Sequence, residues 1–221
     1  MAKRVGLLLS GCGVYDGAEI HESVSAMLAL DKAGAEIICM APDIPQHHVI
    51  NHLAGQESKG EVRNVLVEAA RIARGNIKNI KDVKVSDIDA LVIPGGFGSA
   101  KNFSTYAFDG EKCKLNSDVA RLIREVVRAK KPLGAICITP VIVAKAFEGE
   151  KEKPELTIGT DKATGANIEK MGSINFECPV TGFHVDRVNK IVSTPAYMMA
   201  TRISQVYEGV EKLVNAVLAL C

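Results

Sequence analysis

Residues 132–140 read Pro-Leu-Gly-Ala-Ile-Cys-Ile-Thr-Pro, an apolar run that ends in a cysteine and a proline-bearing turn. Residues 133–136 are all apolar, which is typical of a buried strand. Pro140 suits the first turn of a helix, where its missing N–H is no loss. The stretch therefore predicts a strand that turns abruptly into a helix, the arrangement called a nucleophile elbow, with Cys137 above the sheet.

Cys137 is the strongest candidate for a reactive residue. The free N–H groups and the positive dipole end of a following helix favour a thiolate, so we expect a thiol pKa below its ordinary value. The alternative is a buried, inert cysteine, which is the common state of a free cysteine. Of the other five cysteines, only Cys12, within the stretch SGCG at residues 10–13, has a comparable setting.

Short apolar runs alternate with amphipathic helical patterns along the chain, which predicts βαβ units and a parallel sheet. Strands are expected at residues 4–10, 36–40, 90–93, 133–136, 156–159, 183–186 and 190–194. Helices are expected at 18–32, within 62–73, around 119–127 and from 203 to the C-terminus. The first is marked by Ile20, Val24, Met27 and Leu28 on one face. We therefore expect one α/β domain over residues 1–221, doubly wound, with a mostly parallel sheet and helices on both faces.

The loops that follow the strands define the expected site. In doubly wound sheets ligands bind outside the carboxyl ends of the strands. The loops after Ser10, Asp43, Pro94 and Ile136 should therefore share one edge of the sheet. The long connection at residues 44–87 is expected to be a lid or an interface element. The residues collected at this edge are Cys12, Glu22, Gly95, Gly96 and Cys137.

These residues suit the attack of a thiol on a carbonyl group. Backbone N–H groups of Gly96 and Ile138 could bind the developing oxyanion, although paired glycines also serve a tight turn that has no chemistry. Glu22 is the best candidate for a proton carrier, with Glu19 and His21 as competitors. A glutamate buried against the thiol should have a raised pKa.

Composition excludes several classes of protein. The 27 basic and 26 acidic residues give a net charge of +1, and no basic cluster is interleaved with aromatics, which argues against nucleic acid as a partner. No apolar run is long enough for a membrane span. The six cysteines form no C-x-x-C pair, so a reducing compartment is expected: the cytoplasm, or the mitochondrion in a eukaryote.

Two cofactor sites are disfavoured. Residues 11–16, GCGVYD, begin like a dinucleotide-binding loop but place Asp16 where the third glycine belongs. His47, His48 and His52 have no cysteine or acidic cluster around them that would complete a metal site. We therefore expect no cofactor and no metal.

Several motifs together resemble the ThiJ/PfpI superfamily of class I glutamine amidotransferase-like proteins. The motifs are GAEIHE at 17–22, VIPGG at 92–96 and AICITP at 135–140, in the order of that superfamily's acid, glycine-pair and nucleophile motifs. Four further stretches are similar to its ElbB-type branch, which is named for isoprenoid biosynthesis and glyoxalase activity. These are residues 10–17, 49–52, 63–71 and 193–198.

The resemblance implies a flavodoxin-like three-layer sandwich, a homodimer and a cofactor-free glyoxalase that converts glyoxal, a small carbonyl substrate, to glycolate. It implies Cys137 as the nucleophile and Glu22 as its acid/base partner. The N–H groups of Gly96 and Ile138 would be the oxyanion donors, beside Gly95.

The chain departs from better-studied branches in one respect, since no histidine lies near residues 156–160. His21, Tyr15 or His184 could replace it, and these three with Cys12 are expected around the pocket. The missing histidine argues against a glutaminase with a Cys-His-Glu triad. Two alternatives stay open: a non-catalytic protein, linked to isoprenoid metabolism, that senses redox state or binds a metabolite through Cys137, and an amidohydrolase or amidotransferase subunit that borrows groups from a partner.

Overall fold

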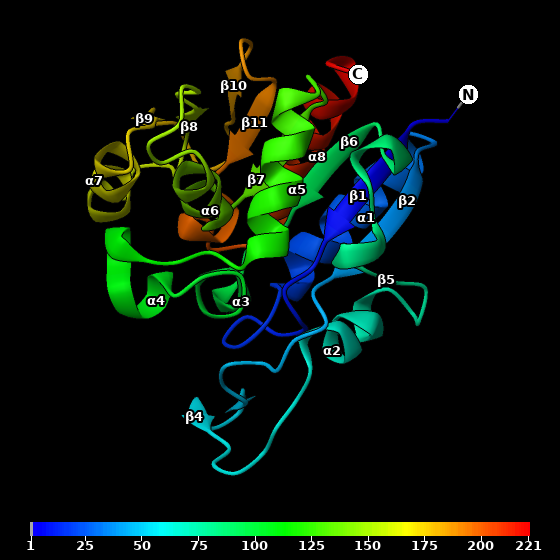
Figure 1. The fold of residues 1–221 in the computed structure, drawn as a ribbon, viewed down its shortest axis with the longest axis vertical. Coiled ribbons are helices and arrows are strands. Elements are labelled where there is room, and N and C mark those ends of the chain that lie inside the picture. Colours follow the sequence, from blue (N-terminus) through cyan, green and yellow to red (C-terminus); the bar gives the residue numbers. More distant parts are fainter. Residues whose placement is uncertain (1) are drawn as a thin grey trace.

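The computed structural model of the chain describes residues 2–221, and its centre is a seven-stranded sheet with helices on both faces (Figure 1). The strand order is β10-β11-β7-β6-β1-β2-β5. All neighbours are parallel except the β10–β11 hairpin. The strands are β1 (Arg4–Leu8), β2 (Glu36–Ala41), β5 (Lys78–Asn79), β6 (Ala90–Ile93), β7 (Leu133–Ile136), β10 (His184–Asp186) and β11 (Ile191–Thr194). The predicted flavodoxin-like α/β class is confirmed.

The central strands are buried along their whole length. Every residue of β6 and β7 is buried, and both strands have the bounds that the sequence predicts. Parallel strands covered on two faces are uniformly apolar rather than alternating. This is why the short runs at residues 90–93 and 133–136 could be recognised.

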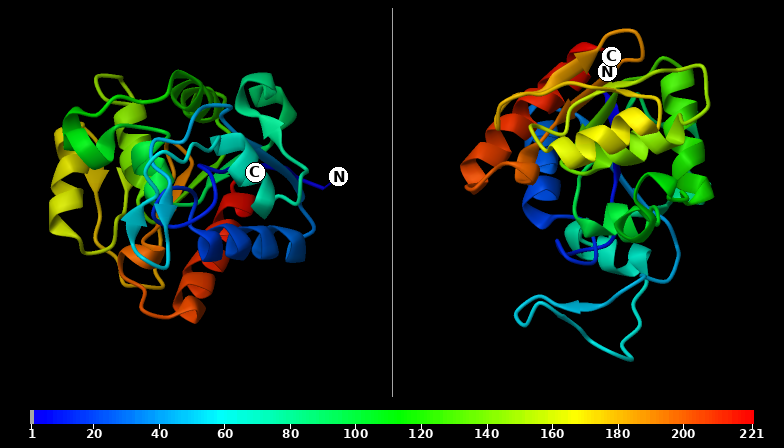
Figure 2. Two further views of the ribbon diagram at one scale, coloured as in Figure 1. Left: turned by 90° about the horizontal axis from the view of Figure 1, so that it is seen from below. Right: turned by 90° about the vertical axis from the view of Figure 1, so that its left-hand side faces the viewer.

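Helices cover the two faces of the sheet, as Figures 1 and 2 show from three directions. The side chains beneath them form two separate apolar clusters. One face carries α5 and α6, with α7 beside α6; the other carries α1, α2 and α8. The helices are α1 (Ile20–Lys32), α2 (Val65–Ile72), α3 (Phe97–Lys101), α4 (Tyr106–Asp109), α5 (Ser117–Arg128), α6 (Thr139–Ala146), α7 (Lys162–Lys170) and α8 (Ile203–Ala219). Within residues 2–221, none of the helices has the length and hydropathy that a membrane span requires.

Helix α1 lies where the sequence predicts it, but its apolar stripe is turned outward. Ile20, Val24 and Leu28 expose 42%, 50% and 47% of their surface. The buried side instead carries Ala26 and Ala29, which allow close packing against α8, and the carboxyl group of Glu22. Helical spacing therefore identified the helix, but it did not show which side faces the core.

The long connection between β2 and β6 projects from the sheet. It holds a small hairpin of β3 (Ile50–Asn51) and β4 (Gln56–Glu57), at the bottom of Figure 1, followed by α2. The Ile50 N–H donates to the buried carboxylate of Asp16 at 2.7 Å, which fastens the hairpin to the loop after β1.

The segment after α6 differs from the prediction. The strand expected at residues 156–159 is only β8 (Glu155–Leu156), which pairs with β9 (Ile174–Asn175) in a small separate sheet. The strand ends because the Thr157 N–H donates to the Ser193 hydroxyl at 2.8 Å and Gly159 adopts a φ of 79°. Helix α7, which the sequence did not reveal, connects β8 to β9.

The topology defines where a ligand would bind. Successive strands run outward from β1 through β2 to β5, and the chain then returns to place β6 on the other side of β1. This reversal between β1 and β6 is the position at which doubly wound proteins bind ligands. The carboxyl ends of β7 and β11 lie at the same edge, because both strands are parallel to β6.

Candidate active site

Cys137 occupies the sharp turn between β7 and α6. Its backbone has a φ of 63°, a left-handed conformation that costs a non-glycine residue about 1–2 kcal/mol. The Cys137 N–H donates to the Thr194 carbonyl at 2.9 Å, which holds the turn against the end of β11. The predicted strand-turn-helix elbow is thus present, with the first turn of α6 directly after the cysteine.

Thr139 fixes the elbow from inside. Its fully buried hydroxyl accepts the Ile136 N–H at 2.8 Å. The same hydroxyl donates to the carbonyl of Ile93 at 3.0 Å or of Ile136 at 2.9 Å. One side chain therefore ties the ends of β6 and β7 together beneath Cys137.

Glu22 lies beside Cys137 with no exposure to solvent. Its Oε2 accepts the Gly95 N–H at 2.9 Å, and its Oε1 accepts the Tyr197 N–H at 3.2 Å. Its carboxyl group and the Cys137 side chain both lie against Gly95, close enough for each to act on the pKa of the other. The structure thus places Glu22 next to Cys137, and Glu22 bridges the loops that follow β6 and β11. The catalytic role of the pair stays a prediction.

The pKa values of the pair are both raised. Burial, with a smaller contribution from the charge of Glu19, raises the pKa of Glu22 to about 8. Burial and the neighbouring Glu22 also raise the pKa of Cys137 well above its ordinary value, although N–H groups of Gly96 and Ile138 act on the sulfur in the opposite direction. The expected lowering of the thiol pKa was therefore wrong, because desolvation outweighs the helix terminus.

Neither Gly95 nor Gly96 has room for a side chain, and Gly96 also has a left-handed backbone conformation. A Cβ on Gly95 would lie 2.5 Å from the Cys137 Cβ and 2.8 Å from Glu22 Oε2. A Cβ on Gly96, whose φ is 96°, would lie 2.4 Å from the Gly17 carbonyl oxygen. Gly95 thus lets the chain pass next to both members of the pair, while Gly96 turns its N–H toward the sulfur.

A cavity of about 420 Å³ opens in front of Cys137, which keeps 8% of its surface exposed. Its walls come from the loops after β1, β6, β7 and β11, together with α3 and α4. The lining residues are Val14, Glu19, Gly96, Phe97, Ala100, Tyr106, Ala107, Cys137, Ile138, Tyr197 and Met198. The thiol is therefore accessible to a small molecule.

Four residues expected around the pocket lie elsewhere. Cys12 lies near Glu68 and Arg71 of α2 and has a pKa raised by burial. Tyr15 contacts the ring of His52. His184 pairs with Glu155 at 2.9 Å on β10. The prediction that these three residues surround the pocket was therefore wrong, because none of Cys12, Tyr15 and His184 lines the cavity.

His21, the fourth, reaches the cavity only indirectly. Its Nδ1 is 2.7 Å from the hydroxyl of Tyr197, whose side chain lines the cavity. Of the three proposed replacements for the missing histidine, His21 is therefore the one connected to the site. No residue from 44 to 87 lines the cavity, so the long connection is not a lid over it.

Tyr197 and Met198 were not predicted as site residues. They follow β11, and a strand parallel to β7 delivers its following loop to the same edge of the sheet. The rule that ligands bind at the carboxyl ends of parallel strands would also have predicted the loop after β11, if the direction of β11 had been known from the sequence. Tyr106 and Ala107 belong to α4, a short helix that no local sequence pattern predicted.

The family model described as "DJ-1/PfpI family" matches residues 12–153, a segment that contains the acid, the glycine pair and the elbow. The chain belongs to the DJ-1/PfpI family. The predicted relationship to ThiJ/PfpI proteins is thereby confirmed.

Two mammalian relatives match this chain over nearly its whole length. The "ES1 protein homolog, mitochondrial" of Rattus norvegicus is 45% identical over 98% of this chain and 84% of its own length. The human "Glutamine amidotransferase-like class 1 domain-containing protein 3, mitochondrial" is 45% identical over 99% of this chain and 84% of its own length.

Solved structures share the fold of this chain. The crystal structure of an isoprenoid biosynthesis protein with an amidotransferase-like domain from Ehrlichia chaffeensis has a TM-score of 0.91 and 38% identity, covering 99% of this chain and all of that one. The match to DJ-1beta of Drosophila melanogaster has a TM-score of 0.58 and 18% identity, covers all of this chain and 96% of that one, and shows the shared fold.

Thr139→Val tests the support of the elbow. We expect a loss of about 1–3 kcal/mol in the free energy of unfolding, because the Ile136 N–H loses its hydroxyl partner in a buried site. Urea unfolding measures the loss. Thr139→Ser keeps the hydroxyl and should lose only the contribution of a methyl group, about 1 kcal/mol. Equal losses in the two variants would contradict this role of the hydroxyl.

The raised pKa of Glu22 predicts a pH-dependent stability. The folded state favours the protonated carboxyl, so the contribution of Glu22 is full below pH about 4.5 and is lost as the pH rises to about 8. We expect the difference in free energy of unfolding between the wild type and Glu22→Gln to shift against the wild type from pH 5 to pH 8 and then level off. Urea unfolding at each pH measures it. A pH-independent difference would show that Glu22 is charged in the folded protein throughout.

Proposed function

We propose that the protein is a cysteine-dependent, cofactor-free glyoxalase that converts glyoxal, and related small 2-oxoaldehydes, to 2-hydroxy acids. The observation that supports this most directly is the close pair of Cys137, which lines a cavity that admits a small molecule, and Glu22, which is buried behind it. A nucleophile and a carboxyl group able to exchange its proton at neutral pH are the groups that this reaction needs.

The proposed reaction needs no external oxidant or reductant. The Cys137 thiol gives its proton to the Glu22 carboxylate as the sulfur forms a bond to the aldehyde carbon. The carbonyl oxygen then takes that proton from Glu22, giving a hemithioacetal. The Glu22 carboxylate then removes the hydrogen of that carbon as a proton and returns a proton to the adjacent carbonyl carbon through an enediol. The product is a thioester, in which one carbon is oxidised and its neighbour reduced. Water hydrolyses it to the hydroxy acid and restores the thiol.

The hydrogen bonds of the site support these roles. N–H groups of Gly96 and Ile138 act on the sulfur, so an oxygen formed next to the sulfur would lie near the same donors. The Gly95 N–H is already used by Glu22, which makes Gly95 a positioning residue rather than an oxyanion donor. His21 could exchange protons with solvent through the Tyr197 hydroxyl.

The alternatives fit the geometry less well. Redox-sensing cysteines are exposed and have low pKa values, whereas Cys137 is buried and its pKa is raised. A glutaminase needs a histidine beside the cysteine, and none of the histidines in residues 2–221 lines the cavity. The six free cysteines favour a reducing compartment, the cytoplasm or the mitochondrion, which we keep as part of the proposal.

Turnover of glyoxal by purified protein tests the proposal. Cys137→Ala should abolish formation of glycolate, and Glu22→Gln should lower kcat by at least about 100-fold, as expected for loss of a general acid–base. Cys12→Ala is the matched control, because its thiol lies outside the cavity, and it should keep wild-type turnover. In the wild type kcat/KM should rise as the pH approaches 8, since the pair must lose one proton before attack.

Equal glycolate formation by the wild type and Cys137→Ala would end the proposal. Selective oxidation of Cys137 by mild peroxide, in a protein that turns over no dicarbonyl compound, would favour the redox sensor instead.

We also propose a homodimer, in which two copies meet through the outward stripe of α1. Ile20, Val24 and Leu28 form a continuous apolar strip on this helix that no other described part of the chain covers. Burying such a strip against its copy would remove it from water.

Light scattering should give twice the chain mass for the wild type and the monomer mass for Val24→Asp. Val67→Asp is the control, because Val67 is 61% exposed on another helix, α2, and should leave the dimer intact. A monomeric wild type at micromolar concentration would exclude this interface.

A further inference from the structure

The cavity in front of Cys137 is much larger than glyoxal requires. Its volume is about 420 Å³. An engineered apolar cavity of about 150 Å³ is sufficient to bind benzene. A two-carbon dialdehyde bound to Cys137 would leave most of this cavity unfilled.

The cavity walls are apolar, including both tyrosines. Val14, Phe97, Ile138 and Met198 supply hydrocarbon, aromatic and thioether surface. The Tyr106 hydroxyl accepts a hydrogen bond from Asn167 Nδ2 at 2.9 Å, and the Tyr197 hydroxyl is paired with His21. Because both phenol oxygens already have partners, the rings offer mainly their apolar faces to a ligand.

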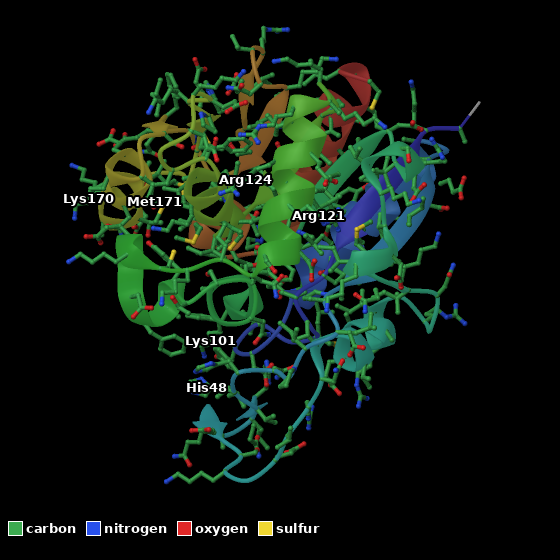
Figure 3. All side chains as sticks on the ribbon, viewed as in Figure 1. His48, Lys101, Arg121, Arg124, Lys170 and Met171 are labelled. Carbon is green, nitrogen blue, oxygen red and sulfur yellow. The ribbon has the colours of Figure 1, made fainter. Side chains whose placement is uncertain are left out.

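The cavity offers no positive charge to an anionic ligand. Among residues 2–221 no lysine, arginine or histidine lines it. Lys101, labelled in Figure 3, directs its ammonium group to the Tyr15 carbonyl at 2.9 Å and lies 5.2 Å from the ring centroid of Phe97. The carboxyl groups nearby are those of Glu19 on the wall and Glu22 behind Cys137. A phosphate or carboxylate would therefore be desolvated without a cationic partner.

We infer that the substrate is an uncharged 2-oxoaldehyde with an aliphatic or aromatic chain of about four to eight carbons, larger than glyoxal and without an acidic group. This inference rests on the proposed function. The aldehyde carbon binds Cys137, and the chain lies along Phe97, Ile138 and Met198. The bonds made and broken are those given for glyoxal, with the chain unchanged, so one water is consumed and a longer 2-hydroxy acid is released.

A substrate series tests the inference. It contains glyoxal, methylglyoxal, 2-oxopentanal, 2-oxoheptanal and phenylglyoxal, with 4-carboxyphenylglyoxal as the acidic counterpart of the last. We expect kcat/KM to rise about fourfold per methylene, the equivalent of about 0.8 kcal/mol for each buried CH₂. Phenylglyoxal should exceed its carboxylated counterpart at least about tenfold. Cys137-dependent turnover that is flat or falls with chain length overturns the inference and leaves the proposed function standing.

A charge placed at the cavity edge gives a second test. Ala107 is exposed, so a longer side chain can be added there without disturbing the core. Ala107→Lys should lower the preference for phenylglyoxal over 4-carboxyphenylglyoxal about tenfold, and Ala107→Gln, of similar length but uncharged, should change it less than about twofold. Equal ratios in the two variants would show that charge does not govern the choice of ligand.

If no 2-oxoaldehyde is turned over, the proposed function fails, and the ligand class is tested by binding alone. Hexanal and glyoxylate are compared as protectants of Cys137 against iodoacetamide, with the extent of alkylation measured by mass spectrometry. Protection by hexanal at a concentration at least tenfold lower supports an apolar ligand site. Equal or better protection by glyoxylate overturns it.

Discussion

The architecture of the site depends on the burial of one carboxyl group. Removing Glu22 from water is unfavourable unless its oxygens find partners, and here they accept N–H groups of Gly95 and Tyr197 while the third contact is the Cys137 thiol. These groups follow β6, β11 and β7 in turn. The carboxyl therefore fixes the first turn of α1 relative to three strand ends, and a shift of any of them would leave a buried polar group unpaired.

Burial also governs the chemistry that these groups can perform. The apolar surroundings that shape the cavity are the same surroundings that raise the pKa values of Cys137 and Glu22. A site that was open to water would ionise more readily, but it would offer little surface to a hydrocarbon chain. The two backbone donors on the sulfur compensate in part, since they favour the charged form without adding polar side chains to the wall.

Much of this arrangement could be predicted from the sequence, because buried parallel strands and the elbow leave local patterns. Strands β6 and β7 have the predicted bounds, and the loops after them bring Cys137 and the glycine pair together. The contribution of Tyr197 was missed, since nothing local shows that β11 is parallel to β7. The direction of the thiol pKa and the side of α1 that faces the core depend on burial by distant segments, which a local pattern does not record.

The left-handed backbone at residue 137 favours glycine, whereas the proposed reaction needs the cysteine side chain there. Glycine adopts this conformation without steric cost, whereas any residue with a Cβ is held there by the rest of the elbow. Selection for folding alone would thus favour loss of the side chain at residue 137. A sequence lineage that abandons the reaction should drift toward glycine at the turn and become more stable as it does so.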